Sequence, residues 1–187
     1  MLLQSINQIL KNGRTCILRS AEGADTEAFV RFSLQVRNET DYLLAGVDEA
    51  EHDPLRVAQR LDAVKSSPTD IHICAFVDGV LVGSASVTRI RNRRKMLHRA
   101  EFGISILQAY NGLGIGSALT EQCILCAKQA GFLQLELEVV AENERAIHLY
   151  QKHGFVEYGR NPLGFRCRDG HWQELVLMRL ELGDHFS

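Results

Sequence analysis

The sequence of 187 residues lacks the features that would place it in a specialised class of protein. It has no long hydrophobic run, and the apolar start at Leu2 is soon broken by Gln4 and Asn7, so neither a membrane span nor a signal peptide is predicted. The net charge is only −2, which gives no general attraction to nucleic acid or anionic lipid. We therefore expect a cytoplasmic protein with no nucleic-acid or membrane partner.

The cysteines and histidines of the sequence indicate neither a disulfide framework nor a metal site. The five cysteines are scattered and odd in number, which does not suggest a disulfide framework. Cys123 and Cys126 form a Cys-x-x-Cys pair, but they lie in a predicted helix with no second pair, which favours buried side chains over a redox site. The seven histidines show no metal-ligand spacing, so no metal is expected.

The composition, with 45% hydrophobic and 24% charged residues, is that of an ordinary globular protein. The length is large for one domain and small for two, so one domain over 1–187 is predicted. Apolar residues at helical spacing over 2–10 predict a short lead-in helix within 1–12, ended by Asn12 and Gly13.

Strands and helices are expected to alternate through the rest of the chain. Asp53 followed by Pro54 is a strong helix start, and Asp78-Gly79 between two strand-like runs is a strong hairpin signal. In order, the expected elements are a strand at 15–19, helices at 25–39 and 54–65, strands at 71–77, 80–90 and 97–107, a helix from 116 to about 130, a strand at 133–140, a helix at 143–153, and strands at 155–158, 164–168 and 172–180.

A glycine-rich loop within 108–119 connects a predicted strand to a predicted helix. Gly112, Gly114 and Gly116 allow the backbone to approach a ligand closely, and the first amides of the following helix have no partners within the helix. Such a loop is a natural binding site for an anion, above all a phosphate group.

The glycine spacing distinguishes between kinds of phosphate site. A nucleoside-triphosphate loop needs a lysine and a hydroxyl residue after its last glycine, whereas Ser117 and Ala118 follow here. A dinucleotide fingerprint needs Gly-x-Gly-x-x-Gly, and this chain has Gly-x-Gly-x-Gly. A nicotinamide-dependent oxidoreductase, with Glu136 as its later acid, is a weaker hypothesis because it does not explain residues 143–155.

The run from Asn111 to Gly116 resembles the acyl-CoA pyrophosphate motif, Gln/Arg-x-x-Gly-x-Gly/Ala, of the GNAT superfamily of acetyl-CoA-dependent N-acetyltransferases. One departure is that Asn111 stands where Gln or Arg is usual. Residues 143–155 resemble a second pattern of this family, Asn-x-x-Ala-x-x-Leu-Tyr-x-x-x-Gly-Phe. Every named position of that pattern is matched, by Asn143, Ala146, Leu149, Tyr150, Gly154 and Phe155.

The resemblance implies an α/β (α+β) GNAT fold, with a central mixed, mostly antiparallel sheet splayed between strands four and five and flanked by helices. It implies an N-acetyltransferase that moves an acetyl group from acetyl-CoA, a cosubstrate, to a primary amine by direct attack in a ternary complex. A noncatalytic acyl-CoA-binding or sensing module on the same fold is the alternative. Because members of this family commonly form dimers, the resemblance also implies a homodimer.

The resemblance also implies roles for single residues. The residues expected to bind acetyl-CoA are Ile106, Leu107, Asn111, Gly112, Leu113, Gly114, Ile115, Gly116 and Asn143. The amides near Ile106 and Leu107 would face the thioester and donate to the oxygen that becomes negative. Tyr150 would protonate the CoA sulfur, although a core tyrosine at this position is the alternative.

The acceptor amine needs a base, since a lysine-like amine has a pKa near ~10.4. Glu101 is the expected base, directly or through water, and Glu138 is the reserve; either could instead be an ordinary strand carboxylate. The acceptor itself stays open between a small-molecule amine and a peptide or protein amine. The acid-rich segment 41–53 lies where family members build their acceptor pocket, and this slightly favours a cationic acceptor.

Overall fold

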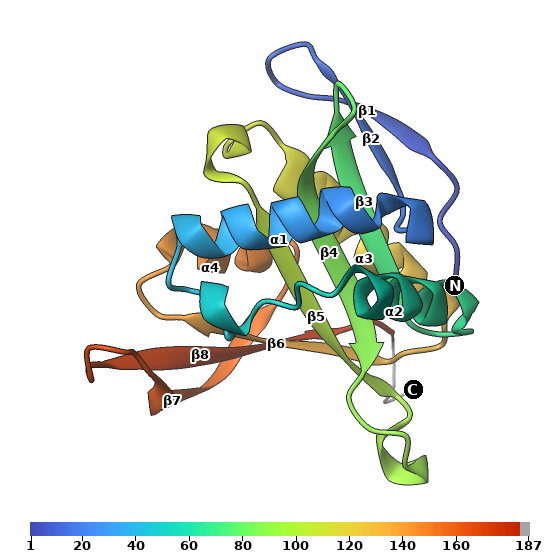
Figure 1. The fold of residues 1–187 in the computed structure, drawn as a ribbon. Coiled ribbons are helices and arrows are strands. Elements are labelled where there is room, and N and C mark those ends of the chain that lie inside the picture. The colour runs from blue at the N-terminus through green and yellow to red at the C-terminus, as the bar shows by residue number, and fades with distance from the viewer. Residues whose placement is uncertain (184–187) are drawn as a thin grey trace.

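The computed structural model describes residues 1–183, which form one eight-stranded sheet with four α-helices around it (Figure 1). The strand order is β1-β2-β3-β4-β5-β6-β8-β7, and only β5 and β6 run parallel to each other. The strands are β1 (Ile6–Ile9), β2 (Thr15–Ser20), β3 (Ile71–Val77), β4 (Val80–Arg89), β5 (Arg99–Ile106), β6 (Gln134–Val140), β7 (Val156–Arg166) and β8 (Trp172–Glu181). The helices are α1 (Thr26–Glu39), α2 (Pro54–Ser66), α3 (Ile115–Gln129) and α4 (Glu144–Lys152). This confirms the mixed, mostly antiparallel sheet with flanking helices.

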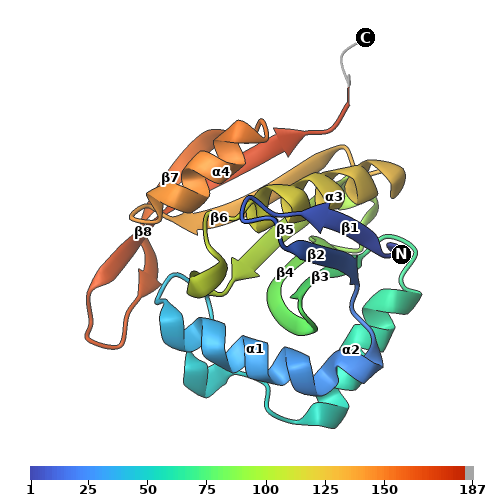
Figure 2. The ribbon, with the colours of Figure 1, turned by 90° about the horizontal axis from the view of Figure 1, so that it is seen from above.

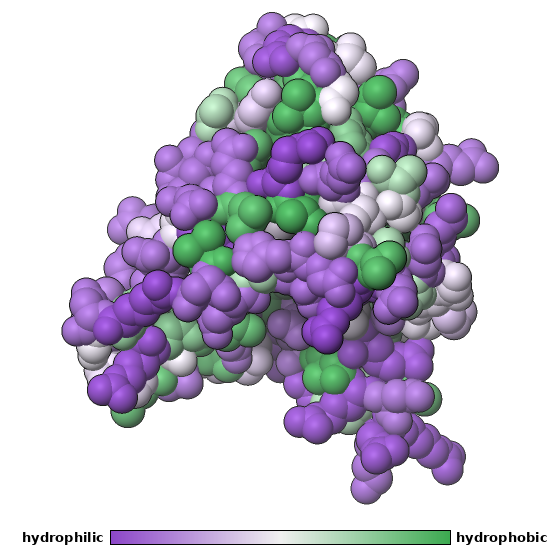
Figure 3. Space-filling view, viewed as in Figure 1, coloured by the Kyte–Doolittle hydropathy of each residue, from purple (hydrophilic) through white to green (hydrophobic). Residues whose placement is uncertain are grey.

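The helices cover the two faces of the sheet in pairs. Viewed from above, α1 and α2 lie on one side of the central strands, and α3 and α4 lie on the other (Figure 2). Because side chains alternate across a strand, β3 contributes to both cores: Ile73 and Ala75 pack on the α3 side, and Cys74 and Phe76 pack on the α1 and α2 side. The outer face at the level of α1 is mixed, with a band of hydrophobic residues between hydrophilic ones (Figure 3). No helix among residues 1–183 is long and apolar enough to cross a membrane.

Local turn chemistry accounts for several element boundaries. The Asp53 side chain accepts a hydrogen bond of 2.9 Å from the Leu55 amide and so caps α2, with Pro54 in its first turn. Asp78 and Gly79 both have positive φ, 49° and 79°, and form the tight turn between β3 and β4. Both features agree with the sequence prediction.

The predicted lead-in helix within 1–12 is wrong, because residues 6–9 form the edge strand β1, which pairs with β2. A helix of this length is marginal in water on its own, whereas pairing with β2 satisfies the backbone of this segment. Asn12-Gly13, interpreted as a helix stop, is instead the turn of a hairpin, and Gly13 has φ 82°. Near the other end of the chain, the strands expected at 155–158 and 164–168 are one strand, β7, with two irregularities in its register.

The parallel pair β5 and β6 is joined over a short distance only. Their ladder has three rungs, which join Arg99 to Gln134, Ala100 to Leu135 and Glu101 to Glu136. β5 then continues beside β4, and β6 continues beside β8, without further rungs between them among the described residues. These two strands are the fourth and fifth of the sequence prediction, and the splay expected between them stays a prediction.

Candidate active site

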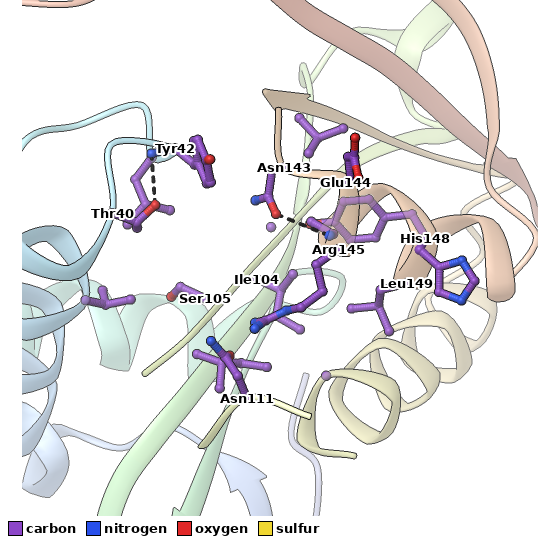
Figure 4. Close-up of a pocket in the computed structure, with 18 of the residues that line it drawn as sticks. Thr40, Tyr42, Ile104, Ser105, Asn111, Asn143, Glu144, Arg145, His148 and Leu149 are labelled. Atoms are coloured by element: carbon purple, nitrogen blue, oxygen red, sulfur yellow. Dashed lines mark hydrogen bonds between the residues drawn. The ribbon is translucent and has the colours of Figure 1, made fainter. Parts of the chain in front are cut away.

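A groove with a volume of about 1100 Å³ lies where the ladder between β5 and β6 ends. It is lined by Ile104 and Ile106 of β5, Val139 of β6, Leu149 of α4 and the glycine loop before α3 (Figure 4). This volume is slightly above the roughly 300 to 1,000 Å³ of single-ligand pockets, so it has room for a long ligand and a second, small one.

The backbone of β5 presents hydrogen-bonding groups to this groove. The Leu107 amide donates to the Val82 carbonyl of β4 at 3.0 Å. Along an antiparallel strand the N–H and C=O groups of successive residues turn to alternate sides, so those of Ile106 and Ile104 turn away from β4 and toward the groove. The prediction that Leu107 offers its amide to the ligand is therefore wrong, because that N–H is already used and Leu107 is buried in the core below α1. Ile106 lines the groove, and its contact with the ligand stays a prediction.

The glycine loop at the end of β5 has the open form that its sequence predicts. Gly112 and Gly114 have φ 77° and 99°, and a Cβ atom built on either would meet no atom within 4 Å. The first hydrogen bond within α3 runs from the Ala118 amide to the Gly114 carbonyl at 3.1 Å, so the preceding amides have no partner within the helix. Among them, Gly116 and Ser117 line the groove.

The other residues predicted to bind the coenzyme differ in whether they line the groove. Leu113 and Ile115 do not line the groove; Ile115 is 1% exposed and both pack on the core beneath α3, so only their backbone could serve a ligand. Asn111 lines the groove, and its buried Oδ1 has no hydrogen-bond partner. Asn143, also in the lining, caps α4 by accepting a hydrogen bond of 3.2 Å from the Ala146 amide.

Tyr150 belongs to the core and to the groove at the same time. It is 7% exposed, and its ring contacts Phe102 edge-on at a centroid distance of 6.1 Å and Phe155 at 5.8 Å. Burial raises the pKa of Tyr150 above its ordinary value. A tyrosine in this state keeps its proton at neutral pH, and Tyr150 also lines the groove.

Glu101 and Glu138, the two candidate bases, both line the groove and are both exposed. Glu101 is opposite Glu136 in the ladder of β5 with β6, and Glu138 follows two residues later on the same face of β6. The two carboxylates therefore lie on the same side of the sheet, the side that α1 and α2 cover. Position alone does not choose between them.

The acceptor end of the groove differs from the sequence prediction. The segment after α1 contributes Thr40, Tyr42, Leu43 and Leu44, and β7 contributes Phe165. The acids of segment 41–53 do not line the groove: Asp48 pairs with Arg168, Glu49 accepts from the Gly46 amide at 2.9 Å, and Asp53 caps α2. The argument for a cationic acceptor from these acids is therefore wrong.

Sequence reasoning missed several charged residues of the lining. These are Lys11, Glu39, Glu142, Glu144, Arg145, His148 and Lys152. Five of them are in or beside the second motif, where their spacing on α4 gave a signal, but Lys11 is in a segment far away in the sequence. Among residues 1–183 no group of three or more His, Cys, Asp or Glu side chains is placed to hold a metal ion.

Comparison with known proteins identifies the family. The family model described as "Acetyltransferase (GNAT) family" matches residues 35–155. The putative phosphinothricin acetyltransferase YwnH of Bacillus subtilis (strain 168) is 26% identical over 167 residues, which are 88% of this chain and 98% of YwnH. The L-amino acid N-acetyltransferase AaaT of Escherichia coli (strain K12) is 32% identical over 107 residues, which are 57% of this chain and 65% of AaaT.

Solved structures give the same result for the fold. An acetyltransferase of the GNAT family from Streptococcus pneumoniae superposes with a TM-score of 0.85 at 31% identity and covers 90% of this chain and 99% of its own. The structure of yncA from Salmonella typhimurium with acetyl-CoA has a TM-score of 0.80 at 22% identity and covers 91% of this chain and 95% of its own. With the fold, the groove and the family model in agreement, the chain belongs to the acetyltransferase (GNAT) family and is an acyltransferase.

Proposed function

We propose that this acyltransferase moves an acetyl group from acetyl-CoA to a primary amine by direct attack in a ternary complex, within a single domain and without a metal. The observation that carries the proposal is that one groove is lined by the glycine loop, by Tyr150 and by Glu101. Two relatives with known structure support the donor, since yncA is described with its cofactor acetyl-CoA and a phosphinothricin acetyltransferase from Sinorhizobium meliloti is described in complex with it.

The glycine loop fits the diphosphate of acetyl-CoA. Gly112 and Gly114 leave open space above the loop, and the first amides of α3 can donate to phosphate oxygens at the positive end of the helix. Asn111 adds no charge, so its contribution to this subsite is at most a hydrogen bond. The pantetheine arm would follow β5, where the backbone groups of Ile104 and Ile106 turn toward the groove.

The chemistry then assigns one task to each group. The amine nitrogen attacks the thioester carbon, and the Ile106 amide donates to the oxygen as it becomes negative. Glu101, directly or through a water, accepts the proton that the amine loses, with Glu138 as the reserve. The C–S bond breaks and Tyr150, which keeps its proton at neutral pH, gives that proton to the departing sulfur.

The acceptor that we infer is a small amine. YwnH is named for phosphinothricin, and AaaT and MnaT of Escherichia coli for L-amino acids, which favours a small amine over a peptide or protein amine. Tyr42, Leu43 and Phe165 would contact its carbon skeleton. A noncatalytic acyl-CoA sensor is the alternative function, while the cytoplasmic location and the homodimer stay predictions from the sequence.

The experiment that tests this proposal has two stages. Thermal unfolding with acetyl-CoA, and with NAD as the control, tests the donor: at about a hundredfold excess over the dissociation constant, bound ligand adds roughly 2.7 kcal/mol, which raises the melting temperature by about 5 °C or more. Turnover with a panel of amines, followed by release of free thiol, then separates an enzyme from a sensor. A rise in melting temperature without turnover of any amine would favour the sensor.

Tyr150→Phe tests the mechanism within that assay. Loss of the hydroxyl should reduce turnover by about a hundredfold, the effect of losing a general acid, and leave the affinity for CoA nearly unchanged. Tyr158→Phe is the matched control, because Tyr158 is 47% exposed and does not line the groove. Equal turnover by the Tyr150 variant and the wild type would remove Tyr150 from the mechanism.

A further inference from the structure

The turn between β1 and β2 lies directly against the glycine loop. The Lys11 amide donates a hydrogen bond of 3.1 Å to the Leu113 carbonyl, between the two glycines of positive φ. Lys11 also lines the groove, and its side chain is exposed. The N-terminal hairpin is thus held beside the anion cradle by its backbone, and it carries a cation there.

The cradle itself has no charge to set against a diphosphate. Backbone amides donate hydrogen bonds to phosphate oxygens, but they do not neutralise them, and Asn111 is neutral. Among the residues that line the groove, the permanent cations are Lys11, Arg145 and Lys152. None of these three forms an ion pair within residues 1–183, whereas Arg14, in the same turn as Lys11, is paired with Asp78. Three cations without an ionic partner among the described residues therefore line this groove.

Arg145 approaches the cradle from α4. Its side chain leaves the first turn of α4 and extends along the groove toward Asn111, while Glu144 lies at the other end, beside Asn143 (Figure 4). The helix thus directs its cation to the phosphate end and keeps its acid away from it. Arginine at this position can donate two hydrogen bonds to one phosphate.

We propose that Lys11 and Arg145 hold the diphosphate of the coenzyme from two sides and supply the positive charge that Asn111 lacks. The N-terminal hairpin is then part of the coenzyme site, although it precedes the segment that the family model matches. This inference rests on the proposed use of acetyl-CoA. Lys11 and Arg145 are binding residues in it and take no part in proton transfer.

Calorimetric titration of CoA into purified variants tests the inference. Lys11→Gln and Arg145→Gln should each weaken binding by about tenfold, as expected for loss of one charged hydrogen bond to phosphate, and Lys11→Arg should bind like the wild type. The loss should shrink as salt is added, since salt screens exposed charges. Lys95→Gln removes an equal charge from the loop between β4 and β5, at the far end of β4 from the hairpin, and should change nothing (Figure 1).

A second titration with 3′-dephospho-CoA identifies the phosphate concerned. The same fold loss for both ligands is expected, because both contain the diphosphate. A loss with CoA alone would place the two cations on the 3′-phosphate and overturn the assignment. The inference alone fails if the wild type binds CoA and both Gln variants, with unchanged melting temperatures, bind it equally well. If the wild type binds no CoA, the proposed function fails, and this inference fails with it.

Discussion

Arg99, on the first rung of the ladder that joins β5 and β6, forms a two-pronged ion pair with Glu136, on the last rung. Glu136 is only 9% exposed. Burial by itself would raise the pKa of Glu136, but the hydrogen bonds from Arg99 and Gln134 lower it overall. The pair therefore keeps a buried charge satisfied where the two strands begin to follow different neighbours.

Replacing one partner of this pair should be much worse than replacing both. Arg99→Met leaves a buried carboxylate without its cation, which should lower the free energy of unfolding by about 3 kcal/mol. The double variant Arg99→Met, Glu136→Met removes the charge as well and should recover most of that loss. Urea unfolding of the wild type and the two variants measures this difference. A double variant no more stable than Arg99→Met would show that the pair does not act as a unit.

Alanine substitutions at two glycines of positive φ separate the effect of backbone strain from the effect on ligand binding. Gly114→Ala forces a side chain onto φ 99° without steric contact, so it should cost about 1 to 2 kcal/mol of stability. Gly170→Ala, at φ 93° in the turn after β7 and equally free of contacts, should cost the same. Only the Gly114 variant should bind CoA less tightly than the wild type. Equal affinities of the two variants for CoA would contradict the role of the loop.

Features set by neighbours in sequence were predictable. The cap at Asp53, the turn at Asp78-Gly79 and the loop at Gly112 to Gly116 depend on local backbone chemistry, and each lies where the sequence predicts it. The N-terminal hairpin could not be recognised with the same ease. Its spacing of apolar residues fits a short helix, and only pairing with β2 makes it a strand, while Asn12-Gly13 suits a helix end and a hairpin turn equally.

The site was predictable as far as its motifs extend. Tyr150, Asn143 and the glycine loop do line the groove, as the two motifs indicated. Leu107 was misassigned because the direction of its amide depends on its register with Val82 of β4, which no local pattern reveals. Lys11 could not be found at all, because it reaches the groove from a hairpin about a hundred residues earlier in the chain.

The two candidate bases should differ in their effect on the pH dependence of catalysis. Glu101→Gln should lower kcat/KM by about a hundredfold near neutral pH and by less in alkaline solution, where more of the amine is already neutral. Glu138→Gln removes an equal charge from the neighbouring strand and should change the profile little. If the pH profile of Glu101→Gln overlays that of the wild type, Glu101 is not the base. If Glu138→Gln shows the larger loss, the reserve assignment is the correct one.

His72 should make the fold sensitive to mild acid. Its Nε2 lies 2.6 Å from the Ser84 hydroxyl, and its ring meets Phe29 edge-on at a centroid distance of 5.1 Å. Burial, and then the charge of Arg60, lower the pKa of His72 from 6.5 to about 4. The folded protein thus binds this proton less well than the unfolded chain does. Stability present above pH 6.5 should therefore be lost as the pH falls toward about 4, by at most roughly 3 kcal/mol.

His72→Gln tests this prediction, because an amide can keep a hydrogen bond to Ser84 but does not titrate. The variant should be less stable at neutral pH, yet its free energy of unfolding should change much less than that of the wild type between pH 6.5 and about 4. The exposed His52 is the control, and His52→Gln should retain the wild-type slope. Asp25 and Glu136, whose pKa values are lowered, start to lose their contribution below about pH 5 in the wild type and the variant alike, so the difference between the two proteins isolates His72. An unchanged slope in His72→Gln would mean that another group takes up the proton.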